Sequence, residues 1–166
     1  MSKKRGLNSI QLWEALSENK VTQDFFNGIF ALDHLDRINS TPGLVIVNTD
    51  PENKPGRHWL LFFFNIDETV DFFDSLGKSP YSYPVFIVNF MMKWAKQVKF
   101  STERVQPEGS ALCGHYCLYY AYSKCTGEKM EQILSHMPSP QWIENCIPVL
   151  FDIANIKSNC QSCISY

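Results

Sequence analysis

The sequence predicts an α+β domain. Runs of β-branched and aromatic residues gather in the middle of the chain, at Leu44–Val47, His58–Phe64 and Thr69–Asp74, and turn-forming residues bound each of them. Helical signals precede these runs and dominate the chain after residue 84. The 166 residues contain no repeat and no long linker, so we expect residues 1–166 to form a single domain.

The first part of the chain is predicted to be helix and turn. Ser9–Asn19 has the pattern of a helix capped by Ser9, with one apolar face made of Ile10, Trp13 and Leu16. Thr22–Phe30 is expected to hold a second short helical turn, and Asp33–Gly43 is polar and turn-prone.

The middle of the chain predicts a buried strand followed by a β-hairpin. His58–Phe64 is a continuous apolar run, which is typical of a central strand covered on both faces. Thr69–Asp74 is expected to be its hairpin partner. If Asn65 and Thr69 close a three-residue turn, the register leaves His58 and Asp74 as diagonal neighbours on one face, about 7–8 Å apart. A turn one residue longer or shorter would separate them.

Helices are expected over most of the remaining chain. Pro84 suits the start of a helix over Val85–Val98, in which Phe86, Phe90 and Trp94 recur every fourth residue. A strand is expected over Lys99–Gln106. Three further segments are expected to be helical or partly helical: Ala111–Lys124 with Gly127 as its C-cap, Glu128–Met137 and Gln141–Asn155.

Composition and charge exclude several broad classes. The net charge of −2 provides no electrostatic footprint for general nucleic-acid binding, and Lys3-Lys4-Arg5 is the only basic run. The longest apolar runs are far too short to span a bilayer, so we expect no membrane contact. No signal-peptide core follows the basic start, so we expect cytosolic synthesis and mostly reduced cysteines.

The stretch Gln106–Lys124 holds the strongest chemical signal. Ser110 is a good N-cap, which would make Cys113 the third residue of a helix. Free N–H groups and the helix dipole favour negative charge there, and thiolate is the reactive form of cysteine. Gly114 removes bulk beside the sulfur, so a substrate backbone could approach. The alternative is that Cys113, like its neighbour Cys117 one turn later, is a small buried hydrophobe.

A catalytic cysteine needs a base and often a third group that orients the base. His115 does not face Cys113 on a helix, and neither His34 nor His136 has an orienting neighbour suggested by the pattern. His58 opens the apolar strand and has Asp74 as its predicted neighbour. Gln106 could donate to an oxyanion together with the backbone N–H of Cys113. Each of these three residues could instead be an ordinary strand-end or solvated residue.

The ordered set His58-Trp59, Asp74, Gln106 and Ser110-x-x-Cys113-Gly114 resembles the adenovirus-type cysteine proteases (adenain), which have relatives in large DNA transposons and other DNA viruses. The stretch Phe72–Gly77 also resembles the SUMO proteases of the same clan. The resemblance extends over residues 25 to 125. It implies a small mixed β-sheet packed with helices, with the nucleophile at the N-terminus of a central helix.

The resemblance also implies roles for individual residues. Cys113 would be the nucleophile, His58 the general base and then acid, Asp74 its orienter, and Gln106 part of the oxyanion hole. Trp59 would wall a narrow cleft that favours glycine beside the cleaved bond. Adenovirus enzymes commonly have glutamate where this chain has Asp74, which is closer to the SUMO-protease and transposon branches.

We therefore expect a cysteine endopeptidase that cleaves viral or mobile-element structural precursors during virion maturation. An isopeptidase for ubiquitin-like modifiers, an acetyltransferase of the same clan and an inactive binding module are the alternatives. We expect a monomer in the host nucleus or cytoplasm, or packaged in the virion.

No cofactor is required by the sequence. The adenovirus enzyme is stimulated by DNA and by a disulfide-forming peptide, but Ala95 stands where that cysteine would be, and the net charge argues against more than a weak nucleic-acid contact. Cys160-x-x-Cys163 lacks the second ligand pair of a zinc site, so we expect no metal.

Overall fold

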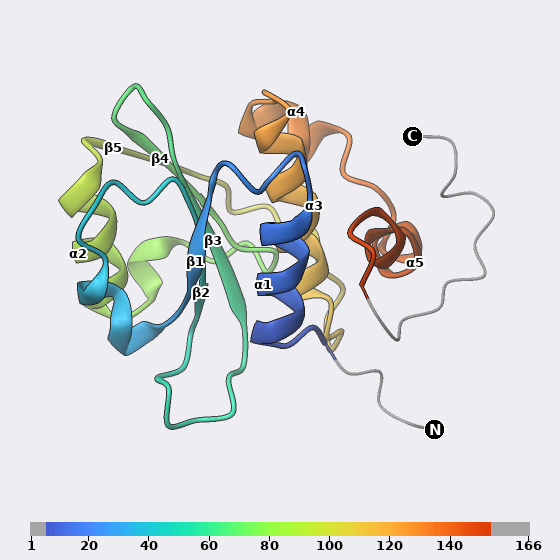
Figure 1. Ribbon diagram of the computed structural model, residues 1–166, viewed down its shortest axis with the longest axis horizontal. Coiled ribbons are helices and arrows are strands. Elements are labelled where there is room, and N and C mark those ends of the chain that lie inside the picture. The colour runs from blue at the N-terminus through green and yellow to red at the C-terminus, as the bar shows by residue number, and fades with distance from the viewer. Residues whose placement is uncertain (1–5, 154–166) are drawn as a thin grey trace.

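A computed structural model describes residues 6–153 of the chain (Figure 1). The strands are β1 (Phe26–Ala31), β2 (Leu44–Asn48), β3 (Trp59–Phe64), β4 (Thr69–Phe73) and β5 (Gln97–Phe100). The α-helices are α1 (Ser9–Glu18), α2 (Val85–Trp94), α3 (Cys113–Cys125), α4 (Met130–Ser135) and α5 (Pro140–Leu150). Two 3-10 helices, η1 (Leu32–Arg37) and η2 (Pro80–Ser82), lie between them.

The five strands form one mixed sheet in the order β1-β2-β3-β4-β5. The pairs β1–β2 and β4–β5 are parallel, whereas β3 is antiparallel to both of its neighbours. Leu61 pairs with Phe73, which is the register expected for a three-residue turn closed by Asn65 and Thr69. The predicted α+β class, the mixed sheet and the hairpin register are therefore confirmed.

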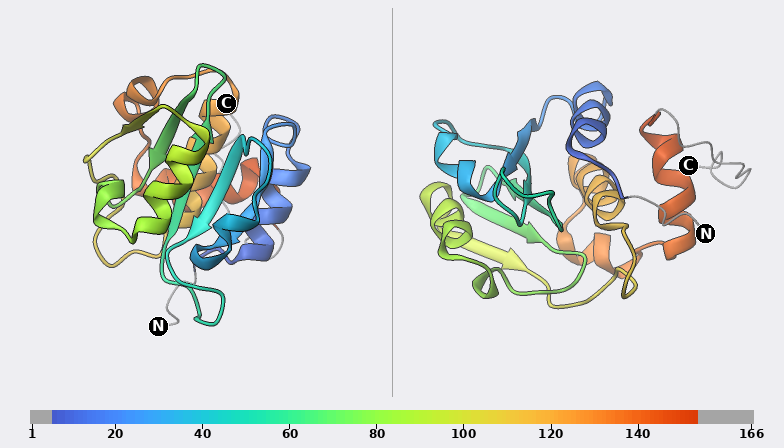
Figure 2. Two further views of the ribbon diagram at one scale, coloured as in Figure 1. Left: turned by 90° about the vertical axis from the view of Figure 1, so that its left-hand side faces the viewer. Right: turned by 90° about the horizontal axis from the view of Figure 1, so that it is seen from below.

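Helices cover both faces of the sheet (Figures 1 and 2). Alternate residues of β3 point to opposite faces, as in any strand. Leu61 and Phe63 pack with buried residues of α1, α3 and α5, whereas Leu60 and Phe62 pack with buried residues of α2 and η1. The central strand is buried on both sides because a core lies on each of them, which explains its continuous apolar run.

Tertiary pairing overrides local propensity near the N-terminus. The helical turn expected within Thr22–Phe30 is confined to its start, where the Phe26 N–H donates to the Thr22 carbonyl at 3.0 Å, because Phe26–Ala31 forms β1 and pairs with β2. Gly28 has φ of +142° inside this strand, a conformation that favours glycine.

The predicted cap and apolar face of the first helix also need correction. Asn8, rather than Ser9, caps α1, because its side chain accepts a hydrogen bond from the Gln11 N–H. The buried residues of α1 are Leu12, Ala15 and Leu16, whereas Ile10 and Trp13 are exposed.

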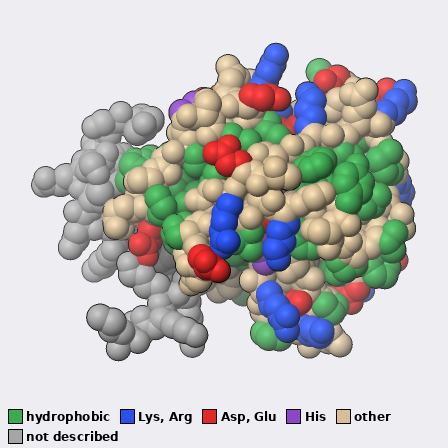
Figure 3. Space-filling model, turned by 180° about the vertical axis from the view of Figure 1, so that it is seen from behind, with side chains coloured by type: hydrophobic (Ala, Val, Ile, Leu, Met, Phe, Trp, Pro, Cys, Tyr) green, Lys and Arg blue, Asp and Glu red, His purple; other side chains and the backbone are tan. Residues whose placement is uncertain are grey.

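Helix α2 is shorter than its periodicity predicts. It ends at Trp94 because Gln97–Phe100 pairs with β4 as an edge strand, so the strand expected over Lys99–Gln106 begins and ends earlier. Phe86 is 56% exposed instead of facing the core. Figure 3 shows apolar side chains at the surface on the side of the molecule where α2 lies. Among the described residues, no helix combines the length and the hydropathy needed to cross a membrane.

A buried carboxylate ties β4 to α3. Asp71 is fully buried and accepts hydrogen bonds from Tyr120 Oη at 2.7 Å and Asn65 Nδ2 at 3.1 Å. Lys124 Nζ lies 3.0 Å from the same carboxylate. The charge is paired and its oxygens are satisfied, which is the condition under which a buried ion pair is tolerated.

Substituting Asp71→Ala should destabilise the protein by about 3 kcal/mol, because it leaves Lys124 and the Tyr120 hydroxyl without their partner. Urea unfolding monitored by circular dichroism measures this change. The matched control is Glu68→Ala, which breaks the exposed pair with Lys96 and should change stability by less than about 0.5 kcal/mol. Equal effects of the two substitutions would contradict this account of Asp71.

Candidate active site

Cys113 is the first residue of α3, at the end of the helix where backbone N–H groups lack intrahelical partners. The predicted N-cap, Ser110, is wrong: Leu112 occupies that position. The Ser110 N–H donates to the Pro107 carbonyl at 3.2 Å, and the Ser110 carbonyl accepts from Gln106 Nε2 at 2.8 Å. Ser110 therefore belongs to a turn before the helix, and the helix starts two residues later than expected for such a cap.

His58 and Asp74 meet just beyond the paired ends of β3 and β4. His58 Nε2 lies 2.6 Å from Asp74 Oδ1, and both side chains are buried. The contact is the one that the hairpin register predicted. Because Nε2 is engaged by the carboxylate, Nδ1 is the ring nitrogen left for proton exchange with a thiol.

Two further groups hold the Asp74 carboxylate. Tyr83 Oη donates to Oδ2 at 2.6 Å, and the Leu76 N–H donates to Oδ1 at 2.9 Å. Burial alone would raise the pKa of Asp74, but the hydrogen bonds from His58, Tyr83 and Leu76 lower it below its usual value. Sequence reasoning missed Tyr83, because nothing in the loop Ser75–Pro84 marks one tyrosine as a partner of Asp74.

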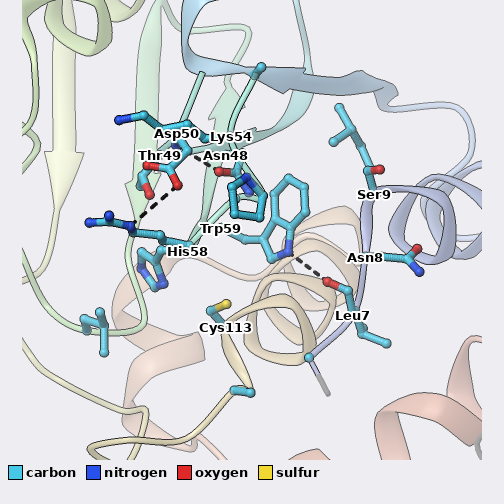
Figure 4. A pocket seen from close by; sticks show the side chains of 18 of the residues that line it. Leu7, Asn8, Ser9, Asn48, Thr49, Asp50, Lys54, His58, Trp59 and Cys113 are labelled. Atoms are coloured by element: carbon cyan, nitrogen blue, oxygen red, sulfur yellow. Dashed lines mark hydrogen bonds and ion pairs between the residues drawn. The ribbon is translucent and has the colours of Figure 1, made fainter. Parts of the chain in front are cut away.

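The same contacts favour a protonated His58. Burial lowers its pKa, but hydrogen bonds with Asp74 and Cys113 and the charges of both groups raise it to about 9. Cys113 lines the same groove as His58 and is close enough to raise the pKa of the imidazole. Figure 4 shows the Cys113 side chain between His58 and Trp59. The predicted nucleophile, base and orienter are brought together from α3, the residue before β3 and the residue after β4.

Gln106 lies in the loop before α3 and lines the same groove as Cys113. Its Oε1 accepts from the buried Ser75 hydroxyl at 2.6 Å, and its Nε2 donates to the Ser110 carbonyl at 2.8 Å. An amide nitrogen carries two hydrogens, so one remains available to a ligand in the groove. This placement suits the oxyanion role predicted from the sequence, which remains a prediction.

The groove has a volume of about 1430 Å³. Its walls include the loop between β2 and β3, the loop before α3, and residues 6–9. Trp59 lines it, as expected, and its indole Nε1 donates to the Leu7 carbonyl at 2.9 Å (Figure 4). The segment before α1 therefore holds one wall of the groove in place, which no local sequence pattern indicated.

The sequence predicts open space for a substrate backbone beside Gly114, but other residues of the chain pack closely there. A β-carbon at this position would lie 3.1 Å from Leu7 Cβ and 3.4 Å from the Trp59 ring. The close approach at Gly114 is therefore made by the chain's own N-terminal segment, and its role as a substrate contact remains a prediction.

The other histidines and Cys117 have partners or surroundings of their own. His34 pairs with Glu52 at 3.0 Å, and His136 pairs with Glu128 at 3.1 Å. His115 is buried on α3, and burial lowers its pKa to about 4 despite the charge of Glu144. Cys117 is fully buried, and burial raises its pKa well above the usual value. The pair Cys160 and Cys163 lies outside the described residues.

Two comparisons, one of sequence and one of structure, find similarity to viral proteins named as proteases. The chain is 31% identical over 117 residues to a protein of Acanthamoeba polyphaga mimivirus named "Putative thiol protease R355". That match covers 64% of this chain and 37% of the relative, so the chain spans little more than a third of the relative's length. The crystal structure of the ASFV pS273R protease matches with a TM-score of 0.64 at 15% identity, over 92% of this chain and 68% of that one. No protein-family model matches the chain.

The structural match confirms the fold as that of a viral protease, and the sequence match is to a protein named as a thiol protease. Together they support the wider cysteine-protease clan that includes the SUMO proteases. The narrower likeness to the adenovirus-type family remains a prediction.

The imidazole of His58 should titrate with a pKa near 9 in the intact protein. Asp74→Asn should lower this pKa markedly, because the carboxylate that most opposes the effect of burial is lost and only Cys113 still raises the pKa. NMR titration of labelled histidine measures both values. Tyr83→Phe keeps the carboxylate and should produce a much smaller change. An unchanged pKa in Asp74→Asn would show that another group holds the imidazolium.

Proposed function

We propose that the chain is a cysteine protease with Cys113 as nucleophile, His58 as general base and acid, and Asp74 as the orienter of His58. The observation that carries the proposal is the 2.6 Å contact between His58 and Asp74, with His58 in the same groove as Cys113 at a helix N-terminus. A nucleophile, a base and an orienter gathered in one site are the geometric signature of this chemistry.

The reaction would proceed by acyl transfer. His58 Nδ1 takes the thiol proton, or already holds it in a thiolate–imidazolium pair, and the sulfur of Cys113 attacks the scissile carbonyl carbon to form a tetrahedral intermediate. When this intermediate collapses, the C–N bond breaks and the imidazolium protonates the leaving amine. Water, deprotonated by His58, then attacks the thioester, and its C–S bond breaks to release the acid and the thiol.

The oxyanion of each intermediate would be stabilised by the free N–H of Gln106 Nε2 and the backbone N–H of Cys113. Asp74 keeps the imidazole in one orientation and stabilises its protonated form. Tyr83 and Leu76 satisfy the remaining hydrogen-bonding capacity of Asp74, so the carboxylate stays ionised inside the protein.

The proposed substrate is an extended polypeptide in the groove, with Trp59 restricting the space beside the cleaved bond in favour of glycine. Structural precursors of a virus or mobile element are the proposed natural substrates, cleaved inside host cells or particles by a monomer without a cofactor. An isopeptidase acting on ubiquitin-like conjugates is the second candidate, because aspartate is the third member of the triad, as the SUMO-protease resemblance implies.

Cys113→Ala and His58→Ala should each abolish cleavage, because one removes the nucleophile and the other its base, while thermal unfolding stays close to wild type. The assay uses a panel of Gly-Gly-containing peptides together with SUMO and ubiquitin conjugates, with and without DNA. Cleavage of the peptides alone would favour the endopeptidase, and cleavage of the conjugates alone the isopeptidase.

Cys125→Ala is the matched control, since this free cysteine lies at the opposite end of α3. It should cleave at the wild-type rate and react with a Gly-Gly vinyl methyl ester in the same way, with one adduct on Cys113. Full activity of Cys113→Ala would refute the assignment of the nucleophile.

A further inference from the structure

We propose that Ser75 is a positioning residue that holds the Gln106 amide in the orientation needed to donate to the oxyanion. The proposal rests on the proposed function and assigns to Ser75 a role in the same site. Ser75 does not stand out in the sequence as a catalytic group.

The hydrogen bonds of Gln106 decide which way its amide faces. Ser75 Oγ donates to Oε1 at 2.6 Å, and Ser75 is fully buried. On the other side, Nε2 donates to the Ser110 carbonyl, which can only accept. The two contacts therefore select the same orientation, in which a nitrogen and not an oxygen is presented to the groove.

Loss of the Ser75 hydroxyl would leave Gln106 Oε1 buried without a donor. Gln106 is itself only 4% exposed, so water cannot easily replace the hydroxyl. A buried carbonyl without a donor destabilises this placement of the amide, and displacement of the Gln106 side chain is the available relief, because rotation would set Oε1 against the Ser110 carbonyl. A displaced amide would no longer hold its N–H in place for the oxyanion.

The backbone of Ser75 also forms hydrogen bonds with the segment that contains Gln106. The Ser75 carbonyl accepts from the N–H groups of Val105 and Gln106, at 3.0 Å and 2.9 Å. Two residues later, a β-carbon at Gly77 would lie 2.7 Å from the Thr102 carbonyl, so the two segments are in direct backbone contact. The loop that carries Gln106 is therefore fastened along the segment that begins with Asp74.

The neighbouring residues Asp74 and Ser75 therefore each position one group of the proposed reaction. The Asp74 side chain orients the base, and the Ser75 side chain orients the oxyanion donor. The two functions remain separable, because Ser75 contacts neither His58 nor Cys113 in any hydrogen bond of the described residues. A change at Ser75 should therefore weaken acyl transfer while the nucleophile keeps its reactivity.

The test measures kcat and KM for wild type, Ser75→Ala, Gln106→Ala and the double variant. Losing one oxyanion donor typically lowers kcat by about 10²–10³, so Ser75→Ala should lower kcat by roughly 10- to 100-fold with little change in KM. The double variant should be no slower than Gln106→Ala, because both changes remove the same interaction. Ser135→Ala, on the exposed surface of α4, is the control and should keep full activity.

Alkylation of Cys113 by iodoacetamide supplies a second readout, because displacement of iodide by the thiolate forms no oxyanion. Ser75→Ala should be alkylated at the wild-type rate, whereas His58→Ala should react more slowly. Full kcat in Ser75→Ala, additive losses in the double variant, or slower alkylation of Ser75→Ala would each overturn the role of Ser75. If wild type cleaved no substrate and reacted no faster than His58→Ala, the proposed function itself would fail, and the role of Ser75 with it.

Discussion

The antiparallel register between β3 and β4 is the constraint on which the candidate site depends. It brings His58, one residue before β3, to Asp74, one residue after β4. Since side chains alternate along a strand, a slip of one residue would turn Asp74 to the opposite face and away from His58. The apolar residues of β3 cannot prevent such a slip on their own, because both faces of the strand are buried.

Asp71 fixes the strand register that the apolar residues of β3 leave open. In the observed register its carboxylate meets Tyr120 and Lys124 of α3. A slip would turn this charge into the opposite core, among apolar residues such as Ile87 and Phe90 of α2, and away from Lys124 and Tyr120. Burial of a charge without its partner is costly, so the ion pair specifies the register as well as the contact between the sheet and α3.

Much of the groove is built from segments outside the helices and strands. The segment before α1 braces Trp59 through the Leu7 carbonyl, and Gly6 lies so close to Ala111 that a β-carbon would be 2.6 Å from its carbonyl oxygen. On the other side, the loop before α3 is fastened to Ser75 and Gly77.

The sequence by itself determined the α+β class, the central strand, the hairpin and the pairing of His58 with Asp74. These follow from local patterns: a continuous apolar run, a short turn, and the two-residue period of a strand. Tertiary structure alone decided that Phe26–Ala31 is a strand, that Ser110 is not a cap, that Gly114 packs against Leu7, and that Tyr83 and Ser75 hydrogen-bond Asp74 and Gln106. Each of these depends on hydrogen bonds or contacts between segments far apart in the chain or in irregular loops, whose free energy exceeds local preference and leaves no periodic trace in the sequence.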